Sequence, residues 1–250
     1  MDDDTRNPDP RNQASDPAGD ADSPSPFSHD RIGDHTSERG SHQIDPELGE
    51  EWQRLIVELR RVMAASVELD APSDTLRELA DRMHELANHM GEKAAGRGVP
   101  LYGSGWRSRA VPADLATRMP FSPVIGTFNP LASPLRVTLE DERVIGRGSF
   151  NSLYQGAPGL VHGSMISASY DELLAMTGIV KNVAGPTARL TVHFRKPTPL
   201  DTELRFEAWI ERSTERYTLA RGRCLIGDEL ISNAEGLFAR ITARTAPGSQ

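Results

Sequence analysis

The sequence predicts an α+β protein in which a curved antiparallel sheet wraps around one buried helix, with a helical extension in front of it. The first observation is residues 163–177, which are apolar most of the way around a helix, so this helix should be buried rather than amphipathic. The second is a set of alternating segments, two before this helix and four after it, with no helix between the last four. Strands joined in this way pair antiparallel, and the apolar face of their sheet needs a cover, which the helix supplies.

The expected strands show the alternation of polar and apolar residues that is typical of half-buried β-structure. In residues 187–195 the alternation divides the side chains between two faces, with Leu190, Val192 and Phe194 on one and Thr187, Arg189, Thr191 and His193 on the other. The turn residues Gly227 and Asp228 separate the last two strands. The six expected strands are 135–140, 143–150, 187–195, 204–210, 217–226 and 229–241.

The central helix follows the turn residues Pro158 and Gly159 and is expected to begin near Gly163, since Gly and Ser are acceptable first residues. Its early residues are small, which lets a sheet approach closely. Asp171 lies in its middle. A carboxylate inside a buried helix is costly unless it is paired or used, so Asp171 is the first candidate for chemistry.

The chain divides by composition. Apolar residues recur at helical spacing in two segments interrupted at residues 70–74, which predicts two helices joined by a turn. The residues before them are rich in Asp, Pro, Ser and Gly, with too few large apolar side chains to offset chain entropy. The expected parts are a disordered acidic tail (1–47), a helical hairpin (48–93), a Gly- and Pro-rich lead-in (94–134), the sheet domain (135–242) and a flexible C-terminus (243–250).

Charge and composition narrow the classes of protein. The net charge is -8, but residues 1–50 alone carry a net charge of -9, so the remainder is close to neutral and has no basic stripe for nucleic acid. The second helix of the hairpin mixes acidic and basic residues, which argues against a helix-turn-helix DNA reader. The single Cys224 excludes an internal disulfide and suits a reducing compartment. With no signal peptide and no membrane-length apolar run, we expect a cytoplasmic protein.

Two stretches then point to a family. The first runs Gln155-Gly-Ala-Pro-Gly-Leu-Val-His162-Gly163 and is followed by Asp171, and the second runs from Thr187 to Pro197. Together they resemble the PaaI-like acyl-CoA thioesterases, which have the hotdog fold, and the resemblance covers roughly residues 120–242. It implies a hotdog fold for the sheet and helix predicted above.

The resemblance also implies roles for individual residues. Asp171 would activate the attacking water or attack the thioester itself, and the amide of Gly163 would polarise the thioester carbonyl. Thr187, which opens the next strand, would assist at the nucleophile, and His162 occupies the position of the motif His. Ser164 departs from the family, which usually has a second Gly there. No Asn matches the polar loop residue of some members, and Gln155 is the nearest candidate.

Substrate contacts are expected from polar and basic residues around these positions. His193 could touch the ligand or only a partner chain. Arg195, Lys196, Arg212 and Arg216 could meet the phosphates of coenzyme A, although exposed basic residues at strand ends are usually only solvated. The catalytic candidates also have structural interpretations: Asp171 could bond to neighbouring amides, His162 could orient its loop, and Thr187 could be an ordinary strand residue. Glu172 lies about 100° around the helix from Asp171 and is interpreted as structural.

Helix geometry adds a constraint on assembly. If the helix is continuous, Gly163 and Asp171 lie about 12 Å apart along its axis, at roughly 1.5 Å per residue. One carbonyl group cannot touch both, so the two groups at one site must come from two copies of the chain. We therefore expect a homodimer or a dimer of dimers with composite sites.

The expected activity is hydrolysis of a medium- to long-chain fatty acyl-CoA to the free acid and coenzyme A, without a metal or redox cofactor. No His/Cys cluster has the spacing of metal ligands, and no Gly-rich phosphate loop follows a strand. Three alternatives stay open: a non-catalytic acyl-CoA-binding regulatory protein, an enoyl-CoA hydratase, and an interaction module that uses the acidic tail and hairpin.

Overall fold

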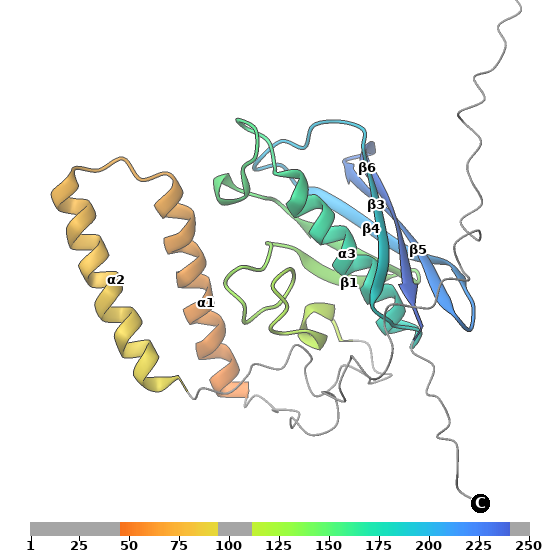
Figure 1. Ribbon diagram of the computed structural model, residues 1–250, viewed down its shortest axis with the longest axis horizontal. Helices are drawn as coiled ribbons and strands as arrows, with labels where there is room; N and C mark the ends of the chain where they lie inside the picture. The colour runs from red at the N-terminus through yellow and green to blue at the C-terminus, as the bar shows by residue number, and fades with distance from the viewer. Residues whose placement is uncertain (1–45, 95–111, 241–250) are drawn as a thin grey trace, which may run out of the picture. The chain divides into compact units, whose positions relative to one another are not determined.

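The computed structural model describes residues 46–94 and 112–240 (Figure 1). The predicted disordered acidic tail lies outside the described residues, except for its last two positions, where the first helix has already begun. Part of the predicted lead-in, residues 95–111, and the predicted flexible C-terminus lie outside them as well.

Six antiparallel strands form one sheet in the order β1-β2-β4-β5-β6-β3. Their bounds are β1 Arg136–Glu140, β2 Arg143–Gly148, β3 Thr187–Phe194, β4 Leu204–Ser213, β5 Tyr217–Ile226 and β6 Glu229–Ala239. The β1–β2 turn uses Asp141 and Glu142, both at positive φ, and the β5–β6 turn uses Gly227 at φ 56°. Both turns match the right-handed twist of two-residue hairpins. The predicted antiparallel sheet is confirmed.

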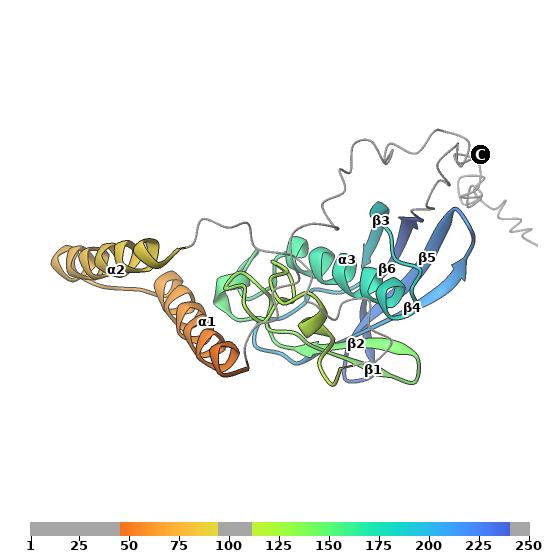
Figure 2. The same cartoon turned by 90° about the horizontal axis from the view of Figure 1, so that it is seen from below.

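Helix α3, Gly163–Val180, lies along one face of this curved sheet (Figures 1 and 2). Half of its 18 residues are buried, from Ile166 to Ile179, which explains why its sequence is apolar on most sides. The sheet comes closest where β2 carries Gly146, since a Cβ there would lie 2.9 Å from a methyl carbon of Leu173. The predicted hotdog arrangement of a sheet around a buried helix is confirmed.

Core contacts between the helix and the sheet include a polar link at Tyr170. Its hydroxyl lies 2.9 Å from the hydroxyl of Ser232 on β6, and its ring meets Phe206 of β4 edge to face, with centroids 5.3 Å apart. Cys224 is fully buried beside them, and burial raises the pKa of its thiol to about 12. Its side chain therefore packs as a small apolar group.

The register of β3 corrects one prediction. Strict alternation placed Thr187 on the same face as Arg189, Thr191 and His193, and this is wrong. A β-bulge between Thr187 and Arg189 pairs Thr187 with Phe238, a core residue, while Arg189 pairs with Leu237. One extra residue in a strand reverses the face of every residue before it. Thr187 therefore faces α3.

The N-terminal extension consists of α1, Pro46–Val67, and α2, Ser73–Lys93, so the predicted helical extension is confirmed. Helix α1 packs on residues 120–129, where Trp52 contacts the rings of Phe121 and Phe128 at centroid distances of 5.3 and 5.5 Å. Arg60 donates to the carbonyl oxygens of Gly126 and Asn129 at 3.1 and 2.7 Å. These bonds attach α1 to the segment that precedes the sheet.

Two short 3₁₀ helices, η3 (Leu115–Arg118) and η4 (Ser152–Tyr154), flank β1 and β2. Leu115 and Met119 are buried in the same core as α3. Among residues 46–94 and 112–240, no helix combines the length and the apolarity needed to cross a membrane.

Candidate active site

Asp171 lies in the middle of α3 and is bonded to β3. The hydroxyl of Thr187 donates to Oδ1 of Asp171 at 2.8 Å, and the Asp171 side chain is half-buried. Within the described part of the chain, no group donates to its other oxygen, Oδ2. The β-bulge of β3 makes this contact possible, because it turns Thr187 toward the helix. The carboxylate is therefore oriented through one oxygen, while the other remains available for a water molecule.

The N-terminus of α3 provides a second polar group. Gly163 is its first residue, and the N–H groups in a helix's first turn have no partner within the helix. The helix dipole makes this end favourable for negative charge. His162 caps the helix, since its Nδ1 accepts from the amide of Ser164 at 3.1 Å and lies 2.6 Å from the Ser164 hydroxyl. The Ser164 amide is thus occupied by the cap, whereas the Gly163 amide has no described acceptor.

The loop before α3 is held by its own hydrogen bonds. Oε1 of Gln155 accepts from the amide of Gly159 at 2.9 Å, so this side chain closes the loop. The amide of His162 donates to the carbonyl of Tyr154 at 2.9 Å. A Cβ on Gly156 would lie 2.9 Å from the backbone of His162, so glycine permits the close approach. These contacts set the position at which α3 begins.

Glu172, next to Asp171, points into a different environment. Its Oε1 accepts from the hydroxyl of Ser122 at 2.9 Å, and Ser122 is fully buried in the segment before β1. Burial is the main cause that raises the pKa of Glu172; the Ser122 bond lowers it, and the charge of Asp171 raises it further. The bond to Ser122 supports the structural interpretation of Glu172. Ser122 was not among the predicted site residues; it lies in the Gly- and Pro-rich lead-in, where only the turn-forming pair Ser122-Pro123 distinguishes it.

The remaining predicted residues do not gather around Asp171. His193 lies on the outer face of the sheet, opposite α3, and Arg195 donates to Oδ1 of Asn233 at 3.0 Å. Lys196 forms an ion pair with Glu229. Arg212 lies over the ring of Tyr217, at 5.4 Å from its centroid, and Arg216 follows in the β4–β5 turn. The strand register separates these cations, since Arg195 follows the end of β3 while Arg212 pairs with Leu219 at the opposite end of the sheet.

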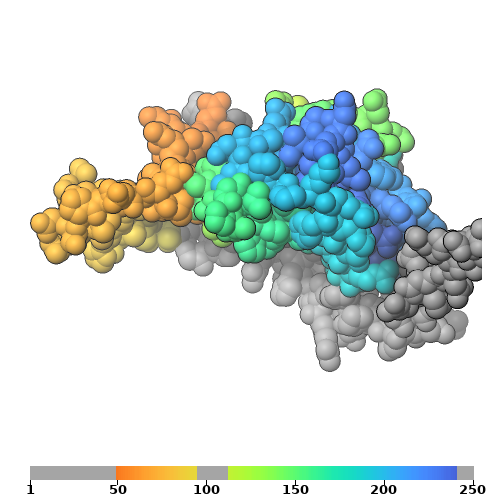
Figure 3. Space-filling view, turned by 90° about the horizontal axis from the view of Figure 1, so that it is seen from above, coloured from red at the N-terminus to blue at the C-terminus, as the bar shows by residue number. Residues whose placement is uncertain are grey.

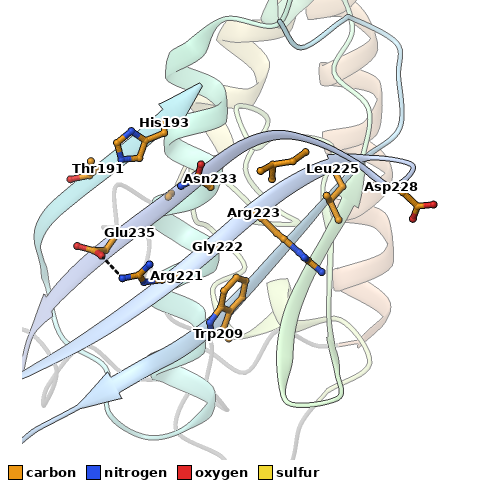
Figure 4. Close-up of a pocket in the computed structure, with 12 residues that line it drawn as sticks. Thr191, His193, Trp209, Arg221, Gly222, Arg223, Leu225, Asp228, Asn233 and Glu235 are labelled. Carbon is orange, nitrogen blue, oxygen red and sulfur yellow. Dashed lines mark ion pairs between the residues drawn. The ribbon is translucent and has the colours of Figure 1, made fainter. Parts of the chain in front are cut away.

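A shallow hollow of about 430 Å³ lies on that outer face (Figure 4). Thr191, His193, Trp209, Arg221 and Asn233 line it, and Arg221 pairs with Glu235 there. The side chains of the same strands that point the other way, such as Cys224, belong to the core around α3. Asp171 and Thr187 do not line this hollow, so the candidate site at Asp171 is separate from it.

The donor set around Asp171 does not resemble a metal site. In residues 46–94 and 112–240, no three or more His, Cys, Asp and Glu side chains gather as metal ligands would. The arrangement instead offers one oriented carboxylate, one hydroxyl and the amides of a helix N-terminus.

This architecture is the hotdog fold, and several of the solved structures that resemble it are described as thioesterases. A crystal structure of a thioesterase superfamily protein matches with a TM-score of 0.65 and 28% sequence identity, over 75% of this chain and 94% of that one. The match covers a larger part of the chain than residues 135–242 make up, so the similarity extends beyond the sheet domain. The predicted resemblance to the thioesterase superfamily is confirmed.

Two more distant structures match a smaller share of the chain. A form of the phenylacetic acid degradation protein PaaI from Thermus thermophilus matches at a TM-score of 0.39 and 17% identity, covering 43% of this chain and 93% of that one. A Streptococcus mutans protein bound to acetyl-CoA matches at 0.42 and 13%, covering 44% and 90%. No protein-family model matches the sequence, and the comparison with curated proteins found no match.

Proposed function

We propose that this protein hydrolyses acyl-CoA thioesters to a free acid and coenzyme A. The observation that carries the proposal is the 2.8 Å bond from Thr187 to Oδ1 of Asp171, which orients a half-buried carboxylate and leaves Oδ2 without a described partner. The similarity to a thioesterase superfamily protein over three quarters of the chain supports the same reaction class.

In the proposed reaction, Asp171 acts as general base for a water molecule or attacks the thioester carbon itself. Negative charge develops on the carbonyl oxygen during either attack. The Gly163 amide stabilises that charge, because it is fixed at a helix N-terminus and needs no reorientation during the reaction. Thr187 keeps the carboxylate in the orientation that the attack requires.

One chain cannot supply both groups to one carbonyl. Helix α3 is continuous from Gly163 to Val180, so Gly163 and Asp171 are separated by about 12 Å along its axis, at roughly 1.5 Å per residue. We therefore propose that each site combines Asp171 of one copy with Gly163 of a second copy.

The edge strand β3 supports a specific two-fold arrangement. Its first residue, Thr187, bonds Asp171, and its last, Phe194, lies against Gly163, where a Cβ would be 3.4 Å from the Phe194 ring. As the last strand of the sheet, β3 has a free backbone edge within the described chain. If two β3 strands pair antiparallel about their midpoint, Thr187 lies opposite the second copy's Phe194. That pairing brings Asp171 toward the second copy's Gly163.

The substrate class is proposed from the lining of the helix. Helix α3 carries Met165 and Ala175, which are only partly buried against the core. Such flexible and small apolar side chains suit a medium- to long-chain fatty acyl group. Within one chain, His162 and Asp171 lie nine positions apart with α3 between them, so an enoyl-CoA hydratase, which needs both on one water molecule, could not be built from a single copy.

The composite site is tested by mixing two inactive proteins. Asp171→Asn removes the base, and Gly163→Pro removes the amide hydrogen; each is expected to show little release of free thiol from palmitoyl-CoA. After joint unfolding and refolding in equal amounts, half of the dimers should be mixed, and each mixed dimer holds one intact site. We expect about a quarter of the wild-type activity to return, by random assortment about a two-fold axis. A mixture as inactive as its components contradicts the composite site, whereas an active Asp171→Asn protein contradicts the assignment of the base.

A further inference from the structure

Helix α2 has one apolar face that nothing in the described chain covers. None of its residues is buried, and five large side chains on it are each 36–45% exposed. They are Leu76, Leu79, Met83, Leu86 and Met90, here called the α2 stripe. Figure 3 shows side chains of α2, coloured orange to yellow, at the surface of the view. A contiguous apolar face of this kind marks an interaction surface.

The spacing of the α2 stripe indicates a helical partner. Its residues follow one another at intervals of three, four, three and four, which is the seven-residue repeat of helices that pack side by side. Ala80 and Ala87 adjoin the stripe and widen it to the face used in helix bundles. At 3.6 residues per turn, all five carboxylates of α2 fall on the opposite side of the helix. Those carboxylates belong to Asp74, Glu78, Asp81, Glu85 and Glu92.

The charges beside the stripe favour an uncharged apolar occupant. Of the basic side chains of α2, Arg82 and Lys93 border the stripe, whereas Arg77 lies with the carboxylates and pairs with Asp74 at 2.7 Å. Arg82 pairs with Glu78 at 3.6 Å, so within the described part of the chain Lys93 is the one cation of α2 beside the stripe without an ion pair, which is too little positive charge for an anionic lipid surface or an acidic peptide. The stripe therefore binds its partner through contacts between apolar side chains.

Helix α1 and the turn after it add a second set of exposed apolar residues. Leu55, Val62 and Leu69 recur every seven residues and are 40–45% exposed. A specific interface buries about 800 Å² per partner, more than half of it apolar, and eight large apolar side chains at this exposure can supply most of that apolar part. A second copy of this chain carries the same two stripes, so two copies together supply all four apolar faces of a four-helix core.

We propose that the α1–α2 segment is an interface between two copies of this chain, in which the two α2 stripes pack antiparallel. The stripe alternates between the a positions (Leu76, Met83, Met90) and the d positions (Leu79, Leu86) of a heptad repeat. In an antiparallel pair, each layer of the core joins an a position of one helix to a d position of the other. Leu79 then meets the second copy's Met90, and Met83 meets the second copy's Leu86. The α1 residues close the sides of this core. This interface is separate from the β3 edge and does not depend on the proposed reaction.

Cysteine cross-linking of the full-length protein tests the proposal. The chain contains only Cys224, which is buried, so an introduced thiol reports on its own position. Met83→Cys places a thiol in the α2 stripe, and Asp81→Cys places one on the carboxylate face of the same helix. With a short bismaleimide at micromolar protein concentration, we expect Met83→Cys to form the covalent dimer at least tenfold faster than Asp81→Cys. Adding Leu86→Glu to Met83→Cys should abolish that difference.

Two outcomes overturn the proposal. The first is a covalent dimer that forms at equal rates from Met83→Cys and Asp81→Cys, since random collision would then explain it. The second is a Met83→Cys protein that stays monomeric and whose thiol is protected from a monofunctional maleimide until Val62→Glu is added. That result would show that α1 of the same chain covers the α2 stripe. Thermal unfolding of each variant shows whether the sheet domain is intact.

Discussion

Thr187 and Asp171 are joined by a hydrogen bond of 2.8 Å that connects the first residue of β3 to the middle of α3. The bond exists because a β-bulge turns Thr187 toward the helix, against the alternation of the strand that follows. It orients the only carboxylate of α3 that bonds to the sheet, since Glu172 bonds instead to Ser122 in the segment before β1. The first two predictions concern the two partners of this bond.

Replacing Asp171 with Asn should remove hydrolysis with little change in stability. The amide can still accept from Thr187, but it cannot take a proton from water, so kcat should fall about 10²- to 10⁴-fold. Thiol release from acyl-CoA esters measures the loss. Asp201→Asn is the matched control: Asp201 is exposed, at φ 52°, a backbone conformation that Asn also accepts. Wild-type turnover by the Asp171→Asn protein would show that another group is the base.

Replacing Thr187 with Val should lower kcat more than it changes KM. The variant keeps the shape of the side chain but removes a donor to a charged acceptor, which is worth roughly 1.5–3 kcal/mol, or about ten- to a hundredfold in rate. Thr187→Ser keeps the hydroxyl and should restore most of the activity. Thr191→Val, on the outer face of the same strand, serves as the control. Equal losses in Thr187→Ser and Thr187→Val would mean that packing, and not the hydrogen bond, is responsible.

Two substitutions at Gly163 distinguish the effect of its amide N–H from the effect of its small size. Gly163→Ala keeps the N–H, and its Cβ would make only an ordinary 3.4 Å contact with the ring of Phe194, so most activity should remain. Gly163→Pro removes the N–H. Pro is favoured at the first position of a helix, and His162 has the extended φ and ψ of -63° and 132° that a residue before Pro requires. The loss should be about 10²- to 10³-fold in kcat, as for other oxyanion donors. If both variants lose activity equally, the amide is not the donor.

Glu172 should make the stability of the protein depend on pH. Its pKa in the folded state is raised, mainly by burial, above the ordinary value of 4.5. The folded protein then holds a proton that the unfolded chain has released, so stability falls as pH rises from about 4.5 through the folded pKa. Glu172→Gln removes this ionisation and still offers Ser122 an acceptor. We expect the variant to gain stability relative to wild type between pH 4 and pH 7.

Urea unfolding at the two pH values measures this difference. The gain should be about 1.4 kcal/mol for each unit by which the folded pKa is raised. Ser122→Ala supplies a second check, since the bond from Ser122 lowers the pKa of Glu172. Removing it should steepen the loss of stability toward neutral pH. A stability difference between wild type and Glu172→Gln that is constant with pH would contradict the buried, raised-pKa carboxyl.

The sequence by itself determined the architecture of the sheet domain, because its signals are local and periodic. The apolar run of α3 lies nearly all around the helix, and the strands alternate, so burial and pairing follow from the pattern. The motif around His162 and Gly163 identified the start of α3, since turn residues and small residues precede it. Asp171 stood out because a carboxylate interrupted an otherwise apolar helix.

Only the tertiary structure decided which face Thr187 occupies and what Glu172 contacts. A single extra residue in β3 reverses the face of Thr187, and side-chain alternation cannot reveal a bulge before the partner strand β6 is in place. The bond from Ser122 to Glu172 spans fifty residues, so it depends on how the segment before β1 folds over α3. Periodicity reports what each segment can bury, whereas contacts between distant segments are set by packing.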